Sequence, residues 1–169
     1  AVTVVDNLST GHRMQVNPGA RWVQLDLLAG DLEDTFAQGG FDIVYHLAAQ
    51  TDVMMSVAAP DEDAEINVVG GIRLLELCRK YHVRKVIYSS SSAVFGEPDY
   101  LPIDEEHPIR PLCPYAASKH AFEHYLYLYG QLHGLNYTVL RYANAYGPRQ
   151  DPRHEGGVVA IFAYRMLTG

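Results

Sequence analysis

The chain has 169 residues, 48% hydrophobic and 20% charged, which is the composition of one globular domain with a core. Its net charge of −7 argues against nucleic acid or an anionic membrane as a partner, because no Lys/Arg cluster offsets it. No basic leader opens the chain and no apolar run approaches ~18 residues, so the sequence predicts a cytoplasmic protein with no membrane partner. The two cysteines, Cys78 and Cys113, have no metal-like spacing, which favours free thiols.

Short apolar runs alternate with helix-like stretches along the whole chain. The runs predicted as strands are Val2–Val5, Trp22–Leu25, Ile43–Leu47, Val86–Tyr88 and Tyr137–Leu140. The stretches predicted as helices are about Asp31–Ala37, Asp61–Tyr81 and Tyr115–His133, and a fourth starts at Val158. This alternation predicts a doubly wound α/β fold, with a parallel sheet covered by helices on both faces, formed by residues 1–169 as one domain.

In such a sheet, ligands bind beyond the carboxyl ends of the strands. Each predicted strand ends in small or polar residues: Asp6, Asp26, Ala48–Ala49, Ser89–Ser92 and Arg141–Asn144. A single group of this kind is usually a solvated loop, but five together favour one ligand-lined edge. The region from Gly96 to Pro114 contains five of the nine prolines, and we expect it to be a long connection that overhangs this edge.

Tyr115 and Lys119 lie four residues apart, directly after Pro114 and 24 residues after Ser91. A tyrosine removes a hydroxyl proton at neutral pH only if its pKa, about 10 in water, is lowered. A lysine one helical turn later shares the same helix face, and its positive charge favours the phenolate. A serine at the end of a neighbouring strand can hold the same substrate hydroxyl. The pattern therefore predicts a Ser–Tyr–Lys catalytic set for hydride transfer.

The same four-residue spacing separates Tyr81 from Lys85. That stretch runs from the polar end of a helical segment into an apolar run, so its two side chains would not share a face. Spacing alone is thus weak evidence, and the proline, the preceding serine strand and the long connection distinguish Tyr115.

Over essentially its whole length the sequence resembles the extended short-chain dehydrogenase/reductase family, most closely its UDP-glucose 4-epimerases. The resemblance implies a Rossmann-like NAD-binding domain, in which Asp6–Gly11 is similar to the end of the family's second strand. An acidic residue there binds the adenosine ribose and repels a 2′-phosphate, which favours NAD over NADP. The other positions implied as cofactor contacts are Asn7, Ser9, Thr10, Gly11, Asp26, Leu27, Leu47, Ala48, Ala49, Asn67, Ser89, Ser90, Tyr115, Lys119 and Tyr142.

The resemblance also implies a reaction, the NAD-dependent epimerisation at C4 of a UDP-hexose through a 4-keto sugar. Ser91, Tyr115 and Asn144 would contact this substrate, and the full-length enzyme would be a homodimer. Dehydratases and decarboxylases of the family typically carry acidic residues directly after the strand serine, where this chain has Ser92 and Ala93. Those activities, and a non-catalytic nucleotide-binding protein, remain alternatives.

One departure from the family pattern concerns the pyrophosphate. The family begins with a strand and a Gly-x-x-Gly-x-x-Gly turn that opens a helix, and this sequence contains no such turn. Because the first strand lies in the middle of the doubly wound order, we expect an interrupted sheet. The chain is interpreted as a fragment that also lacks the C-terminal substrate region, with weak cofactor binding of its own.

A second motif belongs to a different enzyme class. His120, Glu123 and His124 match the H-x-x-E-H pattern of inverted zinc peptidases. At 100° per residue both histidines fall roughly 140–180° from Tyr115 around the same helix, and no third ligand stands out. We therefore predict no metal and interpret the pair as exposed or facing a second subunit.

Overall fold

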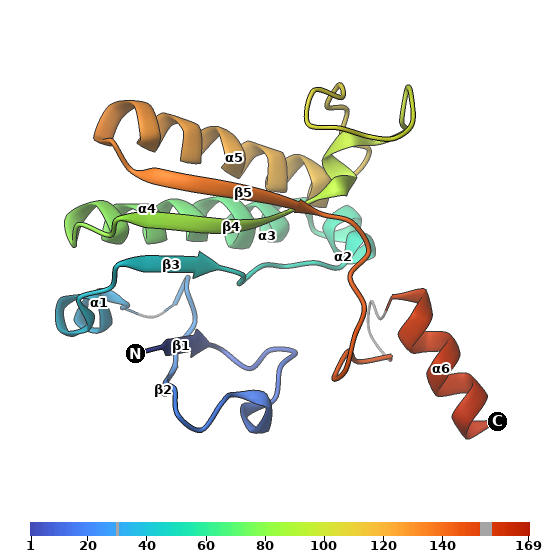
Figure 1. The fold of residues 1–169 in the computed structure, drawn as a ribbon, viewed down its shortest axis with the longest axis horizontal. Coiled ribbons are helices and arrows are strands. Elements are labelled where there is room, and N and C mark those ends of the chain that lie inside the picture. Colours follow the sequence, from blue (N-terminus) through green and yellow to red (C-terminus); the bar gives the residue numbers. More distant parts are fainter. Residues whose placement is uncertain (30, 153–156) are drawn as a thin grey trace.

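The computed structural model describes residues 1–29, 31–152 and 157–169 (Figure 1). Its strands are β1 (Thr3–Asp6), β2 (Arg21–Gln24), β3 (Ile43–His46), β4 (Lys85–Ser91) and β5 (Asn136–Tyr142). Its α-helices are α1 (Glu33–Gly39), α2 (Val53–Ala58), α3 (Pro60–Ala64), α4 (Gly70–Lys80), α5 (Pro114–His133) and α6 (Val158–Thr168). Two short 3₁₀ helices, η1 (Arg13–Gln15) and η3 (Ser92–Phe95), and one π-helical segment, η2 (Glu65–Val69), complete the order.

All described strand pairs are parallel, as predicted. Strand β4 lies in the centre of a three-stranded sheet, between β3 and β5, while β1 and β2 form a sheet of their own. Figure 1 shows β1 and β2 beyond the free edge of β3. The expected interruption of the sheet is confirmed, since no ladder joins β1 to β3 among the described residues.

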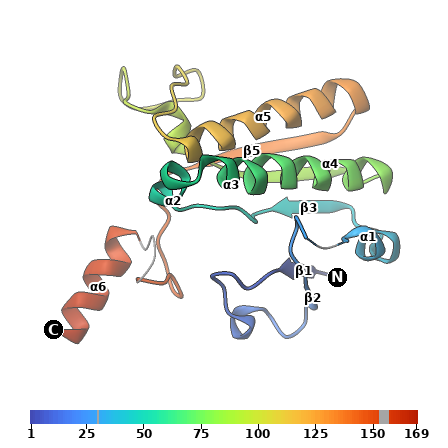
Figure 2. The same cartoon turned by 180° about the vertical axis from the view of Figure 1, so that it is seen from behind.

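Helices α4 and α5 lie side by side over one face of the three-stranded sheet (Figure 2). The helices are amphipathic because their apolar residues recur at the helical period, and each apolar stripe is buried against the strands. On the other face, Ile43 and Tyr45 of β3 are exposed. The described helices thus leave part of this second face of the sheet open. The alternation of strands and helices in the sequence had predicted helices on both faces. Among the described residues, no helix combines the length and the apolar character needed to cross a bilayer.

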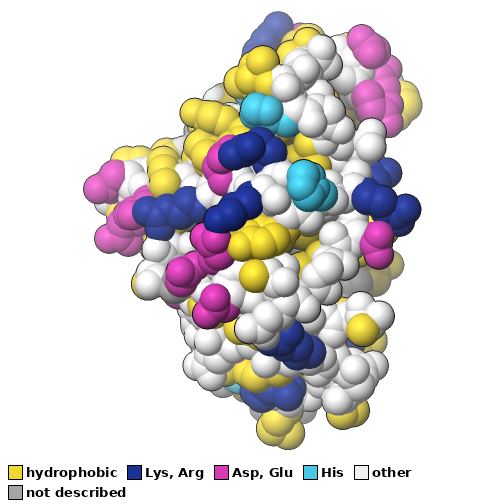
Figure 3. All heavy atoms as spheres, turned by 90° about the vertical axis from the view of Figure 1, so that its left-hand side faces the viewer, with side chains coloured by type: hydrophobic (Ala, Val, Ile, Leu, Met, Phe, Trp, Pro, Cys, Tyr) yellow, Lys and Arg dark blue, Asp and Glu magenta, His cyan; other side chains and the backbone are white. Residues whose placement is uncertain are grey.

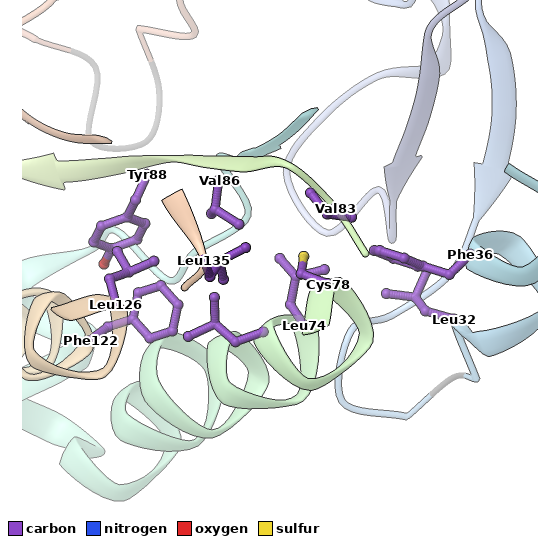
Figure 4. Close-up of a cluster of buried hydrophobic side chains, with 11 residues drawn as sticks. Leu32, Phe36, Leu74, Cys78, Val83, Val86, Tyr88, Phe122, Leu126 and Leu135 are labelled. Carbon is purple, nitrogen blue, oxygen red and sulfur yellow. The ribbon is translucent and has the colours of Figure 1, made fainter. Parts of the chain in front are cut away.

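The core lies between β4 and these two helices (Figure 4). Strand β4 buries every second residue, so Val86 and Tyr88 face α4 and α5. Phe122 and Leu126 of α5 meet them, and each such side chain contributes about 1.5–3 kcal/mol relative to exposure. The two helices approach closely at Gly71, where a Cβ would lie 2.4 Å from the Phe122 ring.

Three elements differ from the predicted pattern. The single helix expected over 61–81 is divided into α3, η2 and α4, because residues 65–69 form a π-turn. The helix α2 was not predicted, although Asp52 is a typical N-cap and accepts a hydrogen bond from the Met55 amide. Strand β4 extends beyond the predicted Val86–Tyr88 through Ser91, since its serines pair in register with Leu140, Arg141 and Tyr142 of β5.

Candidate functional site

The carboxyl end of β4 presents three consecutive serines with three different roles. The Ser89 carbonyl accepts a hydrogen bond from the Lys119 ammonium at 2.9 Å. The buried Ser90 hydroxyl donates to Glu123 Oε1 at 2.5 Å. Ser91 ends the strand, and its Oγ accepts the Ala93 amide at 3.2 Å as the N-cap of η3. This end of the strand is therefore polar and tied to α5.

Helix α5 begins at Pro114, a residue suited to the first helical position because its missing N–H would have no partner there. Tyr115 follows at once and is half-buried, and Lys119 lies one turn later. The Lys119 Nζ atom is 5.8 Å from the centroid of the Tyr115 ring and 5.1 Å from that of Tyr88. The structure thus brings Tyr115 and Lys119 together next to the serine strand, on the helix that packs against β4 and η3.

Lys119 is only 3% exposed, which is rare for a lysine. Burial lowers the pKa of its ammonium group to about 8, and the Asp63 carboxylate acts in the opposite direction. His46 stacks against Tyr88 nearby, and burial, with the Lys119 charge, lowers the pKa of His46 to about 3. His46 is therefore neutral near pH 7, and Lys119 is the group there that titrates close to physiological pH.

Glu123 links α5 to β4 and β5. This structural role was not predicted from the sequence. Its carboxylate accepts two hydrogen bonds from Arg141, from Nε at 3.1 Å and Nη2 at 2.8 Å, besides that from Ser90. Burial alone would raise the pKa of Glu123, but the bonds from Arg141 and Ser90 lower it below its usual value. The available signal was an acidic residue among the buried, mostly apolar positions of α5.

His120 and His124 lie on the same helix as Glu123. His120 Nδ1 is 3.2 Å from Glu123 Oε2, and the two histidine Nε2 atoms are 3.1 Å apart. Within the described part of the chain, no group of three or more His, Cys, Asp or Glu side chains could hold a metal ion. Glu123 is instead engaged with Arg141.

Asn67 was expected to contact the cofactor and lies on η2. It is buried, and its amide hydrogen-bonds to the Gln50 backbone and to the Ser118 hydroxyl. The structure thus places Asn67 behind the first turn of α5 rather than on the surface. Sequence reasoning missed its partners Gln50 and Asp63, although Asp63 precedes it by one helical turn.

The expected adenosine site follows β1 and β2. Asp6 is exposed at the end of β1 and accepts the Leu8 amide through Oδ1 at 2.7 Å. Asn7 donates to Asp26 Oδ2 at 2.7 Å, and this bond, with that from the Leu28 amide, lowers the pKa of Asp26. The loop from Asp6 to Gly11, which includes Ser9 and Thr10, borders a hollow that is also lined by Val4, His12 and Trp22.

The remaining predicted residues follow the other strands. Leu47, Ala48 and Ala49 continue from β3, with Leu47 and Ala48 exposed, and Leu27 lies against Gly70 of α4. Tyr142 ends β5 opposite Ser91, and Asn144 follows it on the surface. The structure therefore brings Ser91, Tyr142, Tyr115 and Lys119 to one edge, whereas Asp6 ends β1 and Asp26 follows β2 of the separate two-stranded sheet.

This arrangement occurs in known proteins. The sequence model described as "NAD dependent epimerase/dehydratase family" matches residues 1–169. The chain is 47% identical over 167 residues to a putative UDP-glucose 4-epimerase of Methanocaldococcus jannaschii, covering 98% of this chain and 55% of that protein. It is 42% identical to a UDP-glucose 4-epimerase of Mycolicibacterium smegmatis, covering 99% of this chain and 56% of that protein.

Solved structures agree with these sequence matches. A crystal structure of a Thermotoga maritima UDP-glucose 4-epimerase with UDP-glucose superposes with a TM-score of 0.95 at 43% identity, covering 98% of this chain and 55% of that one. The Thermus thermophilus UDP-glucose 4-epimerase in complex with NAD gives 0.92 at 49% identity, covering 98% and 54%. The chain spans about half the length of the relatives it matches.

Proposed function

Because the chain belongs to the NAD-dependent epimerase/dehydratase family, we propose that the whole protein containing it epimerises C4 of a UDP-linked hexose. The observation that carries the proposal is the buried Lys119 ammonium beside Tyr115 at the carboxyl end of β4. Burying a lysine side chain costs free energy, and residues with shifted pKa values are concentrated at functional sites. The relatives whose names are UDP-glucose 4-epimerase support the choice of sugar nucleotide.

The proposed roles follow from the positions of the side chains. Tyr115 takes the proton of the sugar's 4-hydroxyl, and the Lys119 charge favours its phenolate form. Ser91 orients the same hydroxyl from the end of β4. Tyr142, the last residue of β5, lies on the nicotinamide side of the site, and Asn144, which follows β5, reaches the phosphates of the sugar nucleotide.

The residues that would hold NAD fit best at its adenosine end. Asp6 offers an exposed carboxylate at the end of β1, the chemistry needed to accept two ribose hydroxyls. The loop to Gly11 and the hollow beside it lie at the same place. When bound, NAD supplies the acceptor and donor of the hydride at C4. The sequence holds no glycine-rich turn for the pyrophosphate, so we propose that residues 1–169 alone bind NAD weakly.

Asp6 also decides the choice between the two nicotinamide cofactors in this proposal. Its carboxylate would repel the 2′-phosphate of NADP, so the whole protein should bind NAD in preference. Titration of both cofactors against the protein and its Asp6→Asn variant tests this. Equal affinities of the unaltered protein for NAD and NADP would contradict the role of Asp6.

We extend the proposal to the remaining features of the molecule. Residues 1–169 form one partial Rossmann-like domain, the other positions implied as cofactor contacts, apart from the buried Asn67 and Ser90, lie at or beyond the carboxyl ends of its strands, and the whole protein acts as a cytoplasmic homodimer. The absence of an acid at Ser92 and Ala93 favours epimerisation over elimination of water.

The decisive experiment follows UDP-galactose in deuterated water by NMR. Epimerisation at C4 by hydride return should produce UDP-glucose with no solvent deuterium on carbon. A dehydratase must remove the C5 proton, so it would introduce deuterium there and lose the 6-hydroxyl. Deuterium at C5, or no turnover of any UDP-hexose by a protein saturated with NAD, would refute the proposed reaction.

A further inference from the structure

Asp63 is a buried carboxylate that the proposed reaction leaves without a role. It lies on α3 and is 1% exposed. Its Oδ1 atom accepts hydrogen bonds from Gln50 Nε2 at 2.9 Å and Asn67 Nδ2 at 3.1 Å. Its Oδ2 atom is buried without a hydrogen-bond partner among the described residues. An acid buried in this way destabilises a fold unless something offsets its desolvation.

A chain of hydrogen bonds leads from Asp63 to the first turn of α5. The Asn67 side-chain amide, which donates a hydrogen bond to Asp63, also donates one to Ser118 Oγ at 3.1 Å. Ser118 in turn donates to the Tyr115 carbonyl at 3.0 Å. The π-turn of η2 carries Asn67, and such turns are frequent at functional sites because they redirect a side chain. Asp63 therefore fixes the amide that supports the backbone beneath Tyr115.

Asp63 also acts on the charge of Lys119. Burial disfavours the Lys119 ammonium, and the Asp63 carboxylate is the charged group that counteracts it. Helix α3 packs against α5, which brings the two groups to the same region of the interior. In a medium of low dielectric constant, a carboxylate and an ammonium interact without direct contact.

The other titratable groups around Lys119 do not replace Asp63. On β3, His46 is neutral, since its pKa is lowered to about 3. On β4, burial raises the pKa of Tyr88, which is therefore also neutral. On α5 itself, Tyr115 is the proposed proton acceptor, and the Glu123 charge is balanced by the ion pair with Arg141 of β5.

We propose that Asp63 is a positioning residue of this site, whose buried carboxylate fixes the Gln50–Asn67–Ser118 network and maintains Lys119 as an ammonium beside Tyr115. The inference deepens the proposed function, because a protonated Lys119 is what favours the phenolate of Tyr115. The inference is tested by measuring the protonation equilibrium of Lys119 in the protein without substrate. The result is therefore independent of whether the proposed reaction occurs.

The chain has three lysines, Lys80, Lys85 and Lys119, which makes a direct measurement possible. Lysine labelled with ¹³C at Cε gives one NMR signal for each, and each signal moves as its amine loses a proton. The signal that Lys119→Met removes belongs to Lys119 and should titrate near pH 8, while that of Lys80 should titrate above its ordinary value because of Glu33.

Asp63→Asn removes the charge and keeps an oxygen that can accept from Gln50 and Asn67. It should lower the Lys119 titration midpoint by about 0.5–1 pH unit, a three- to tenfold change in the protonation equilibrium. Glu62→Gln is the matched control, since it makes the same charge change on the adjacent, exposed residue of α3 and should leave the midpoint in place. A midpoint that Asp63→Asn does not lower, or that Glu62→Gln lowers equally, would overturn the proposal.

If Asp63→Asn does not fold, the same proposal makes a second prediction. The defect would then come from an uncompensated Lys119, so adding Lys119→Met should restore cooperative unfolding in urea. A double variant that also fails to fold would assign Asp63 to the fold alone and refute its role toward Lys119.

Discussion

The charged side chains at the two ends of strand β4 differ in their exposure to solvent. At the amino end, Arg84 pairs with Asp42 and their side chains are 73% and 70% exposed, and Lys80 pairs with Glu33 at the surface. At the carboxyl end, Lys119 and Glu123 are almost completely buried. Figure 3 faces the side of the molecule where α4 ends and β4 begins, and shows positive and negative side chains intermingled there.

The tyrosines at the two ends of β4 differ in the charge of the group beside them. Tyr81 donates a hydrogen bond to Glu33, and partial burial together with this carboxylate raises the pKa of Tyr81. Tyr115 instead has a buried ammonium group one turn away. Exposed pairs are screened by water and contribute little, whereas buried charges alter the chemistry of their neighbours. Of the two Tyr–Lys pairs spaced by four residues, Tyr115–Lys119 has a buried lysine, whereas Lys85, four residues after Tyr81, is only partly buried. Desolvation of the lysine therefore distinguishes the proposed site from the other pair.

The largest expected difference between the two ends is catalytic. In the whole protein, Tyr115→Phe should lower the turnover of UDP-hexose by about 10²–10⁴-fold, the usual effect of losing a general acid–base. Tyr81→Phe is the matched control and should leave turnover unchanged. Steady-state assays with saturating NAD measure both, and equal effects would remove the distinction between the two tyrosines.

The next difference is in how much a carboxylate at each end of β4 contributes to the free energy of unfolding. Glu123→Gln should destabilise the chain by about 3 kcal/mol, because it leaves Arg141 partly buried without its partner. Urea unfolding at pH 7 measures this. The double variant Glu123→Gln/Arg141→Met should recover part of the loss, since no unpaired charge remains. A single variant within about 1 kcal/mol of the unaltered chain would show that the pair is not a structural link.

A third prediction uses pH at the carboxyl end. The pKa of Lys119 is about 8 in the fold against an ordinary value of 10.5, so the unfolded chain binds more protons between these values and stability rises with pH there. Below pH 8 the buried charge costs about 3 kcal/mol. Lys119→Met should therefore be the more stable protein at pH 7, and its advantage should disappear by about pH 10.5. Urea unfolding between these limits measures it, and an advantage independent of pH would contradict the cause.

The smallest effect is expected at the amino end. Glu33→Gln removes the partner of Lys80 and Tyr81, but these groups stay in contact with water. Its urea midpoint should match that of the unaltered chain within experimental error. A loss comparable to that of Glu123→Gln would break the contrast between the two ends of β4.

The sequence by itself determined the strands, the parallel sheet and the Tyr115–Lys119 pair. These features depend on local periodicity, and side chains at positions i and i+4 of a helix share a face whatever surrounds them. The interrupted sheet was predictable for a related reason, because the sequence has no glycine-rich turn and the doubly wound order places the first strand in the middle.

Only the tertiary structure decided which polar residues are buried and with what partners. Asp63 and Lys119 are 56 residues apart, and no local pattern indicates that α3 would pack against α5. The H-x-x-E-H motif shows the same limit, since no local pattern indicates that Glu123 pairs with Arg141 on the next strand. Burial and long-range pairing depend on how the helices pack on the sheet, and these set the pKa of Lys119. A residue's type and spacing specify what it can do, but its desolvation by distant segments determines what it does.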